Sequence, residues 1–189
     1  MKFAVEYGLL EQLLRNSFLD MICKSYTNFP SIRRKHKDKK LVYCSGSFDL
    51  VHAGHILFFE DCKRLGDVLT VGVASDMMLR RNKGKGRPVL NQYVRLKTID
   101  ALKPVDYCFL DESTHRDHLL RVIEEVFKRL RPDIYVINQD TFDIEYRKML
   151  AKKYGVKMKI LKRTAPSEFE EISTTKIIDK IKKSLKSSF

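Results

Sequence analysis

Residues 41–56 read LVYCSGSFDLVHAGHI, and the rest of the chain is interpreted around this stretch. It starts with an apolar run typical of a buried strand, turns around Gly46, and ends with His52 and His55 on either side of Gly54. A strand, a loop and the start of a helix would place both imidazoles beside backbone N–H groups that have no partner within the helix. Such groups attract anions, so the stretch predicts a phosphate site.

The chain after this stretch alternates between apolar runs and amphipathic segments, the pattern of an α/β fold. Residues 67–74, DVLTVGVA, predict a second strand, which completes the βαβ unit of a parallel sheet. Further strands are predicted at 106–110, 133–138 and 156–161, with helices between them. We therefore expect a Rossmann-like, doubly wound sheet of five parallel strands, with helices on both faces and ligands beyond the carboxyl ends of the strands.

Composition sets wider limits. The 189 residues carry a formal net charge of +13 at pH 7, which would attract nucleic acid, acidic lipid or phosphorylated small molecules, and charge alone does not choose between them. The four cysteines form no CxxC pair and three lie in apolar runs, which favours reduced core thiols of a cytoplasmic protein. Charged residues interrupt the N-terminal stretch, so we expect neither a signal peptide nor a membrane span.

Residues 1–40 read as an extension of the main domain, which would cover 41–189. Leucines at helical spacing predict one or two amphipathic helices that end before Asn28-Phe29-Pro30, with an apolar face packed on the main domain or on a second subunit. The basic run 33–40, RRKHKDKK, lacks interleaved aromatic residues. We therefore interpret it as a solvated linker rather than a nucleic-acid patch.

A second basic segment follows the second predicted strand. Residues 80–88, RRNKGKGRP, combine five positive charges with two glycines and a proline. This composition predicts a mobile cationic loop that attracts phosphate, and an ordinary solvated loop is the alternative.

Polar residues stand at two further points. Asp140 follows the fourth predicted strand, where it would face a ligand or cap the next helix through an Asx turn. The run 173–175, STT, precedes an apolar segment at helical spacing and is suited to cap a terminal helix. His115 and His118 have no third ligand near them in the sequence, so we expect surface residues rather than a metal pair.

Together these motifs resemble those of one family. GSFDLVHAGH at 46–55 is similar to the (G)xFDxxHxGH signature of the HxGH-motif nucleotidyltransferases, the cytidylyltransferase-like superfamily. LGDVLTVGVASD at 65–76 resembles its second strand, KGKGRPV at 83–89 its lysine-bearing loop, and ISTTKI at 172–177 its ISTT element. The resemblance covers about residues 40–183. Its members join a nucleoside triphosphate to a phosphorylated small molecule and release pyrophosphate.

The resemblance implies a role for each matching residue. His52 and His55 would bind the α and β phosphates and Lys83 would stabilise the transition state, so these are the predicted catalytic residues. The predicted nucleotide site contains Ser47, Phe48, Asp49, His52, His55, Lys83, Asp140, Ser173, Thr174 and Thr175. Lys85 and Arg95 are predicted to contact the substrate, and a plain surface position is the alternative for Arg95.

The resemblance also implies the partners of the reaction. Mg²⁺ would accompany the triphosphate, held mainly by phosphate oxygens and water rather than by a protein cluster. The adenylyltransferases of heptose 1-phosphate look most similar, which favours ATP, and cytidylyltransferases for glycerol 3-phosphate or a related alcohol phosphate are the alternative. A non-catalytic nucleotide or nucleic-acid binding module on the same scaffold is a third interpretation. We expect a homodimer, with neither nucleic acid nor membrane as a partner.

Overall fold

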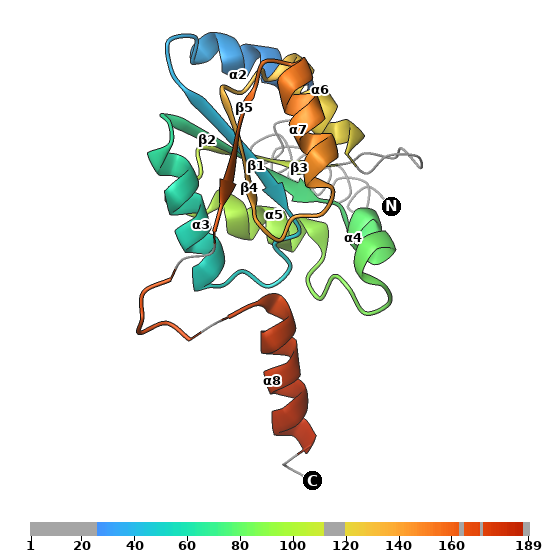
Figure 1. The fold of residues 1–189 in the computed structure, drawn as a ribbon. Coiled ribbons are helices and arrows are strands. Elements are labelled where there is room, and N and C mark those ends of the chain that lie inside the picture. Colours follow the sequence, from blue (N-terminus) through green and yellow to red (C-terminus); the bar gives the residue numbers. More distant parts are fainter. Residues whose placement is uncertain (1–25, 112–119, 163–164, 171, 187–189) are drawn as a thin grey trace, which may run out of the picture.

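A computed structural model describes residues 26–111, 120–162, 165–170 and 172–186 (Figure 1). Its centre is a sheet of five parallel strands in the order β3-β2-β1-β4-β5. The strands are β1 (Leu41–Gly46), β2 (Val68–Ala74), β3 (Tyr107–Asp111), β4 (Ile134–Asn138) and β5 (Lys157–Leu161). The predicted α/β class and parallel sheet are confirmed, and each strand lies within one residue of its predicted bounds.

Helices cover both faces of this sheet, as predicted for a doubly wound fold. In chain order they are the 3₁₀ turn η1 (Tyr26–Asn28), α2 (Phe29–Lys35), α3 (Ala53–Arg64), α4 (Asp76–Lys83), α5 (Gln92–Asp100), α6 (Arg121–Arg129), α7 (Ile144–Lys153) and α8 (Thr174–Lys186). Residues of α2, α6 and α7 form the core on one face, and residues of α3 and α5 form it on the other (Figure 1).

Strand β1 shows how the sequence builds the two halves of the core. Successive side chains of a strand point to opposite faces, so Leu41 and Tyr43 join the α2, α6 and α7 side while Val42 and Cys44 join the α3 and α5 side. All four are fully buried. The cysteines among the described residues are buried and form no disulfide, as predicted for core thiols: Cys44, Cys62 and Cys108.

A helix that was not predicted precedes the first strand. α2 begins at Phe29, and Pro30 lies in its first turn, where the missing N–H of a proline costs no hydrogen bond. Phe29 and Ile32 are buried in the core, and the Phe29 ring lies edge-on to Phe109 with 4.8 Å between centroids. The predicted end of the N-terminal helices before Asn28 stays a prediction, because those helices lie mostly outside the described residues, whereas the basic run begins inside α2 rather than as a linker.

Some predictions are not tested by the described residues. The N-terminal amphipathic helices fall mostly within residues 1–25, and His115 and His118 fall within 112–119, so both lie outside the described residues. The division into an extension and a main domain at residue 40 stays a prediction. The structure adds that α2 packs in the same core as α6 and α7.

The strand order places a switch point between β1 and β4. β4 follows β3 in sequence but lies on the other side of β1, so the chain crosses the sheet between them. The chain leaves β1 toward α3 on one face and leaves β4 toward α7 on the other. Loops that diverge in this way leave a crevice at the carboxyl ends of the two strands, the usual ligand site of such sheets. Both the histidine motif and Asp140 follow these two strands.

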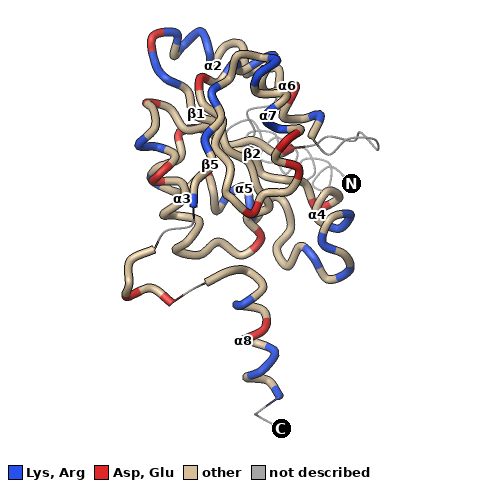
Figure 2. Tube along the Cα trace, viewed as in Figure 1, with Lys and Arg blue, Asp and Glu red and all other residues tan. Residues whose placement is uncertain are grey.

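α8 stands apart from the sheet (Figure 1), and none of its residues is buried. Its apolar residues Ile181 and Leu185 are exposed, and several lysines and one aspartate lie along the same helix (Figure 2). The helices in the described part of the chain are all too short or too polar to cross a membrane.

Candidate active site

The two histidines lie where β1 gives way to α3. His52 holds the N-cap position with extended backbone angles (φ −144°, ψ 170°), and its carbonyl oxygen accepts a hydrogen bond from the His55 amide at 2.9 Å. The two imidazoles stack with their centroids 3.9 Å apart and an interplanar angle of 26°. The predicted position of both rings at a helix start, among N–H groups that attract anions, is thus observed.

Gly54 explains how the rings can pack so closely over the helix. A Cβ atom at this position would lie 3.1 Å from His52 Cε1, tighter than an ordinary contact, so any larger residue would push the ring away. The same Cβ would lie 3.9 Å from Cγ2 of Ile172. Ile172 begins the ISTT run, so a segment far along the chain reaches the histidine motif, as the resemblance predicted.

The start of α8 is capped by Ser173. Its Oγ accepts a hydrogen bond from the Lys176 amide at 3.2 Å, and its carbonyl oxygen accepts one from the Ile177 amide at 2.9 Å. Thr174 and Thr175 form the first turn of the helix. Because Ile172 lies against Gly54, the positive end of a second helix dipole stands near the histidines. The predicted capping of the terminal helix is confirmed.

Phe48 packs against the ring of His55. Its side chain is buried, and its ring lies edge-on to His55 with 5.4 Å between centroids and 5.0 Å from Phe59. The backbone is left-handed here (φ 45°), and a Cβ on Gly46 would lie 2.8 Å from the Phe48 ring. The structure therefore places this predicted nucleotide-binding residue in the core, where it fixes the His55 ring.

Asp49 is buried and bound by a later segment of the chain. Its Oδ2 accepts from Arg87 Nε at 2.6 Å, and its Oδ1 accepts from the amides of Val89 at 2.8 Å and Leu90 at 3.1 Å. The Asp49 side chain is 0% exposed. Both carboxylate oxygens are thus engaged inside the protein, and they connect the histidine loop to the basic segment.

Arg95 makes a second internal connection. Its guanidinium donates to the Leu90 carbonyl at 3.0 Å, to the Ser47 carbonyl at 2.6 Å and to Asp76 Oδ1 at 2.8 Å. The side chain is fully buried, so neither a surface position nor an open substrate contact describes its place in this structure. Arg95 joins three segments at the carboxyl end of the sheet, namely the loop after β1, the start of α4 and the loop before α5.

The basic segment is only partly a loop. α4 is capped by Ser75, whose Oγ accepts from the Met78 amide at 3.3 Å, and it continues to Lys83. Residues 80–83 are therefore the last turn of a helix, where cations are favoured by the helix dipole. The predicted loop from residue 80 is wrong in its first half, and the loop proper covers 84–91.

This loop borders an open hollow of about 660 Å³. Three basic side chains and one carboxylate line it, with apolar residues between them: Asp76, Arg80, Gly84, Lys85, Gly86, Arg87, Pro88, Val89 and Asn91. The predicted substrate residue Lys85 belongs to it, whereas Arg80, Arg87 and Asp76 were not singled out from the sequence. Their sequence signal was membership in the quoted motifs, since Arg80 and Arg87 belong to the basic segment and Asp76 ends the second-strand motif.

Asp140 lies in an exposed turn after β4. The turn is held by the Gln139 amide, which donates to the Leu161 carbonyl at 3.0 Å, and by the Thr141 amide, which donates to the Asn138 carbonyl at 3.1 Å. Since β1 and β4 are adjacent and parallel, this turn is at the same edge of the sheet as the histidines. The N-cap of α7 is Asp143, so Asp140 does not occupy the capping position of that helix.

Within the described ranges, no three His, Cys, Asp or Glu side chains gather as metal ligands would. The buried carboxylate nearest in sequence to the histidines, Asp49, already accepts three hydrogen bonds. The side chains present therefore suit phosphate groups better than a protein-held Mg²⁺ ion.

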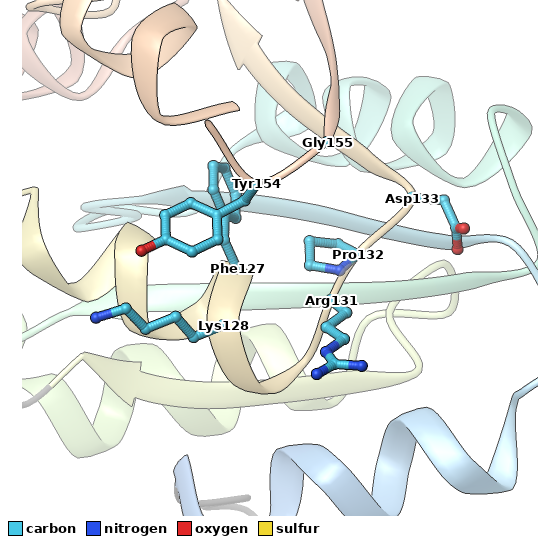
Figure 3. A pocket seen from close by; sticks show the side chains of 7 residues that line it. All are labelled: Phe127, Lys128, Arg131, Pro132, Asp133, Tyr154 and Gly155. Carbon is cyan, nitrogen blue, oxygen red and sulfur yellow. The ribbon is translucent and has the colours of Figure 1, made fainter. Parts of the chain in front are cut away.

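A second hollow lies at the opposite end of the sheet (Figure 3). Its volume is about 440 Å³, and its lining comes from the end of α6, the segment before β4 and the end of α7: Phe127, Lys128, Arg131, Pro132, Asp133, Tyr154 and Gly155. The residues before β4 are at the amino ends of the strands, away from the histidine motif. We do not assign this hollow to the site.

Two stacked histidines at a helix start, at the switch point of a parallel sheet and close to a second helix start, are features of a nucleotide-handling α/β protein. The chain belongs to the cytidylyltransferase-like family, whose model matches residues 43–180. This confirms the predicted membership and the predicted class, the nucleotidyltransferases.

Relatives and solved structures agree with this placement. The bifunctional protein HldE of Campylobacter jejuni (strain RM1221) is 40% identical over 150 residues, which are 78% of this chain and 29% of that protein. The FAD synthase of Aciduliprofundum boonei is 36% identical over 141 residues, which are 74% of this chain and 89% of that protein. This chain therefore spans less than a third of the HldE protein but most of the FAD synthase.

Two solved structures share the fold. The lipopolysaccharide core biosynthesis protein from Thermoplasma volcanium GSS1 has a TM-score of 0.54 and 32% identity, and the match covers 68% of this chain and 99% of that one. A pantoate-beta-alanine ligase from Francisella tularensis has a TM-score of 0.62 with 18% identity, over 82% of this chain and 71% of that one. At that identity the second likeness concerns the fold alone.

Proposed function

We propose that this protein transfers a nucleoside monophosphate from ATP to a phosphorylated small molecule, such as a sugar or polyol phosphate, and releases pyrophosphate. The observation that carries the proposal is the stacked pair His52 and His55 at the start of α3, with the capped start of α8 beside it. Two helix starts and two imidazoles make one concentrated set of hydrogen-bond donors. A triphosphate is the ligand that best uses such a set.

The reaction would be an in-line attack by an acceptor phosphate oxygen on the α-phosphorus of the nucleotide. Pyrophosphate leaves from the opposite side, and no covalent enzyme intermediate is needed. Catalysis then consists of holding two anions together and neutralising the charge that develops. His52 and His55 would donate to the α and β phosphates, Lys83 would approach the reacting phosphate, and residues 173–175 would bind the leaving end.

The acceptor would lie on the side of the basic hollow. Lys85, Arg80 and Arg87 line it, and a phosphate group brings the opposite charge. Apolar Pro88 and Val89 in the same lining leave room for the uncharged part of a small molecule. Mg²⁺ would enter bound to the oxygens of the triphosphate, and no residue of this chain is assigned to it.

ATP is proposed as the donor because relatives named FAD synthase make a product that contains an adenylyl group. CTP with glycerol 3-phosphate or a related alcohol phosphate is the alternative, since the matching family model is described as cytidylyltransferase-like. A homodimer in the cytoplasm completes the proposal. The exposed apolar residues of α8 support the dimer, and the buried thiols, which form no disulfide among the described residues, support the compartment.

The test is pyrophosphate release by the purified chain with ATP or CTP over a panel of sugar and polyol phosphates. We expect release with ATP and at least one acceptor, and none with the acceptor omitted. Release only with CTP would move the assignment to the cytidylyltransferase alternative. If no pyrophosphate is released with any member of the panel, and oligonucleotide binding weakens steeply with salt, the protein would be a binding module rather than an enzyme.

A further inference from the structure

The loop that carries the basic residues is anchored at one of its ends by a single buried carboxylate. Asp49 binds the side chain of Arg87 and the backbone amides of Val89 and Leu90. Arg95 supports the same place, because its Nε donates to the Leu90 carbonyl. The end of the loop is therefore connected to the segment that leads into the histidine motif.

The other end of the loop is held by α4. The Gly84 amide donates to the Arg80 carbonyl at 3.1 Å, which closes the last turn of the helix. Between the two anchors, Gly84 and Gly86 have left-handed backbones (φ 80° and 86°), and a Cβ atom on either would meet nothing within 4 Å. Lys83 ends α4 itself, and Lys85 lies between the two anchors, so the anchors limit where the two lysines can stand.

We propose that Asp49 is a positioning residue, which fixes the basic loop against the segment that leads into the histidine motif by holding Arg87, Val89 and Leu90. The inference rests on the proposed function, because it takes Lys83 to act on the reacting phosphates. Asp49 acts through the loop and does not touch the nucleotide. Its side chain is 0% exposed and both of its oxygens already accept hydrogen bonds from the protein.

The charge of Asp49 matters as much as its shape. A carboxylate offers two acceptor oxygens, one for Arg87 and one for the two amides. An asparagine would keep one acceptor but turn an N–H group toward the guanidinium, so the Arg87 contact would be lost. Breaking a buried ion pair in this way leaves one uncompensated charge, which drives the loop away from its place.

The first experiment measures the anchor without any turnover. Amide hydrogen exchange at Val89 and Leu90 is compared in the wild-type protein and in Asp49→Ala, and we expect exchange at both amides to accelerate at least 10-fold. The control is Asp133→Asn, because Asp133 likewise accepts from an arginine and a backbone amide, Arg33 and Leu41, at the opposite end of β1. In this control the two amides should exchange as in the wild type.

If the alanine variant does not fold, Asp49→Asn is measured in its place, with a several-fold acceleration expected because one acceptor remains. Unchanged exchange at Val89 and Leu90 in the folded variant would overturn the proposed anchor. A wild-type protein without transferase activity would defeat the proposed function, and the exchange comparison would still decide whether Asp49 holds the loop.

The second experiment asks whether Asp49 acts through the lysine. Asp49→Asn should lower kcat about 100-fold, the scale of a small misplacement of a catalytic group. The KM for the nucleotide should change less than about threefold. With the acceptor at saturating concentration, the kcat of the double variant Asp49→Asn with Lys83→Ala should be no lower than that of Lys83→Ala alone, because the other basic residues of the loop then affect acceptor binding rather than turnover. Losses that multiply would overturn the positioning role, as would equal losses in Asp133→Asn.

Discussion

At both ends of the sheet an aspartate accepts hydrogen bonds from a backbone amide and a basic side chain, but the aspartates differ in their exposure to solvent. At the amino ends of the strands, Asp133 accepts from the Leu41 amide at 2.7 Å and Asp106 from the Leu69 amide at 2.7 Å, and each also pairs with a basic side chain. Their side chains are 42% and 38% exposed. At the carboxyl ends, Asp49 makes equivalent bonds to an arginine and to amides, but its side chain is fully buried.

This difference in exposure predicts different effects of mutations at the two ends of the sheet. An exposed ion pair is weakened by water and salt, so the amino-end aspartates hold strand ends at little energetic gain. A buried carboxylate must satisfy every partner, so its geometry is strict and the loops attached to it are fixed. We therefore expect changes away from the histidines to leave turnover per folded molecule unchanged, and changes at the carboxyl end to lower turnover as well as the free energy of unfolding.

The largest expected effect is Phe29→Ala, which removes a buried ring of α2 from the core. The free energy of unfolding should fall by about 3–5 kcal/mol, measured by urea denaturation. Turnover per folded molecule should not change, because α2 lies on the face opposite α3 and α5. The exposed Met149→Ala serves as the control, with a change within about 0.5 kcal/mol. A loss below about 1 kcal/mol for Phe29→Ala would contradict the packing of α2 in the core.

The next effect is His55→Ala, which deletes one of the two stacked imidazoles. Pyrophosphate release should fall about 100- to 1,000-fold, the usual cost of one donor to a developing anion. The matched control is His36→Ala, whose imidazole instead contacts the Tyr107 hydroxyl at 2.9 Å near the amino end of β3. Equal losses of pyrophosphate release in His55→Ala and His36→Ala would contradict the expectation that only the carboxyl end of the sheet takes part in turnover.

A smaller effect is expected at the helix caps. Asn91 Oδ1 accepts from the amides of Tyr93 at 3.0 Å and Val94 at 3.1 Å, so Asn91→Ala should cost about 1 kcal/mol in unfolding free energy. Asn28 holds the same position before α2 without a side-chain bond to the helix. Asn28→Ala should therefore change the urea midpoint far less. Similar shifts in the two variants would contradict the assigned cap.

The smallest effect depends on pH. The Tyr154 hydroxyl, at 2.6 Å, and the Lys153 ammonium, at 2.9 Å, hold the pKa of Glu124 below its usual value. A carboxyl group with a lowered pKa in the folded state stabilises the protein above its unfolded pKa, and this stabilisation disappears as the pH falls through the folded pKa.

Tyr154→Phe should therefore lower the free energy of unfolding by about 0.5–1 kcal/mol at neutral pH. The difference from the wild type should shrink below about pH 4. Urea titrations at several pH values measure it, with Tyr93→Phe as a control that lacks such a carboxylate partner among the described residues. A difference that grows on acidification would reverse the assigned sign.

Most of the fold was readable from the sequence because each strand is a short apolar run between turn residues. The errors came from residues whose meaning depends on position. Pro30 was interpreted as a break, yet a proline in the first turn is compatible with a helix. The glycines and lysines of 80–88 suggested a loop from the start, although Ser75 before Asp76 was an available signal for a helix N-cap.

The sequence predicted the parts of the site that belong to recognisable motifs, but not the contacts between them. The histidine pair and the ISTT run were recognised, and the structure brings them together at Gly54 and Ile172. The buried connections could not be foreseen, because a charged residue in sequence reads as exposed until its partner is known. Asp49 and Arg87 are far apart in the chain, and only the folded sheet makes them neighbours.

The detached position of α8 has an evolutionary consequence. None of its side chains is buried within the chain, so sequence change along the helix meets few packing constraints outside Thr174, Thr175 and the apolar residues proposed for a dimer. Ile172 and Ser173 have no such latitude, since one lies against the histidine motif and the other starts the helix. The last part of the chain should thus vary quickly except at the few residues where it touches the rest.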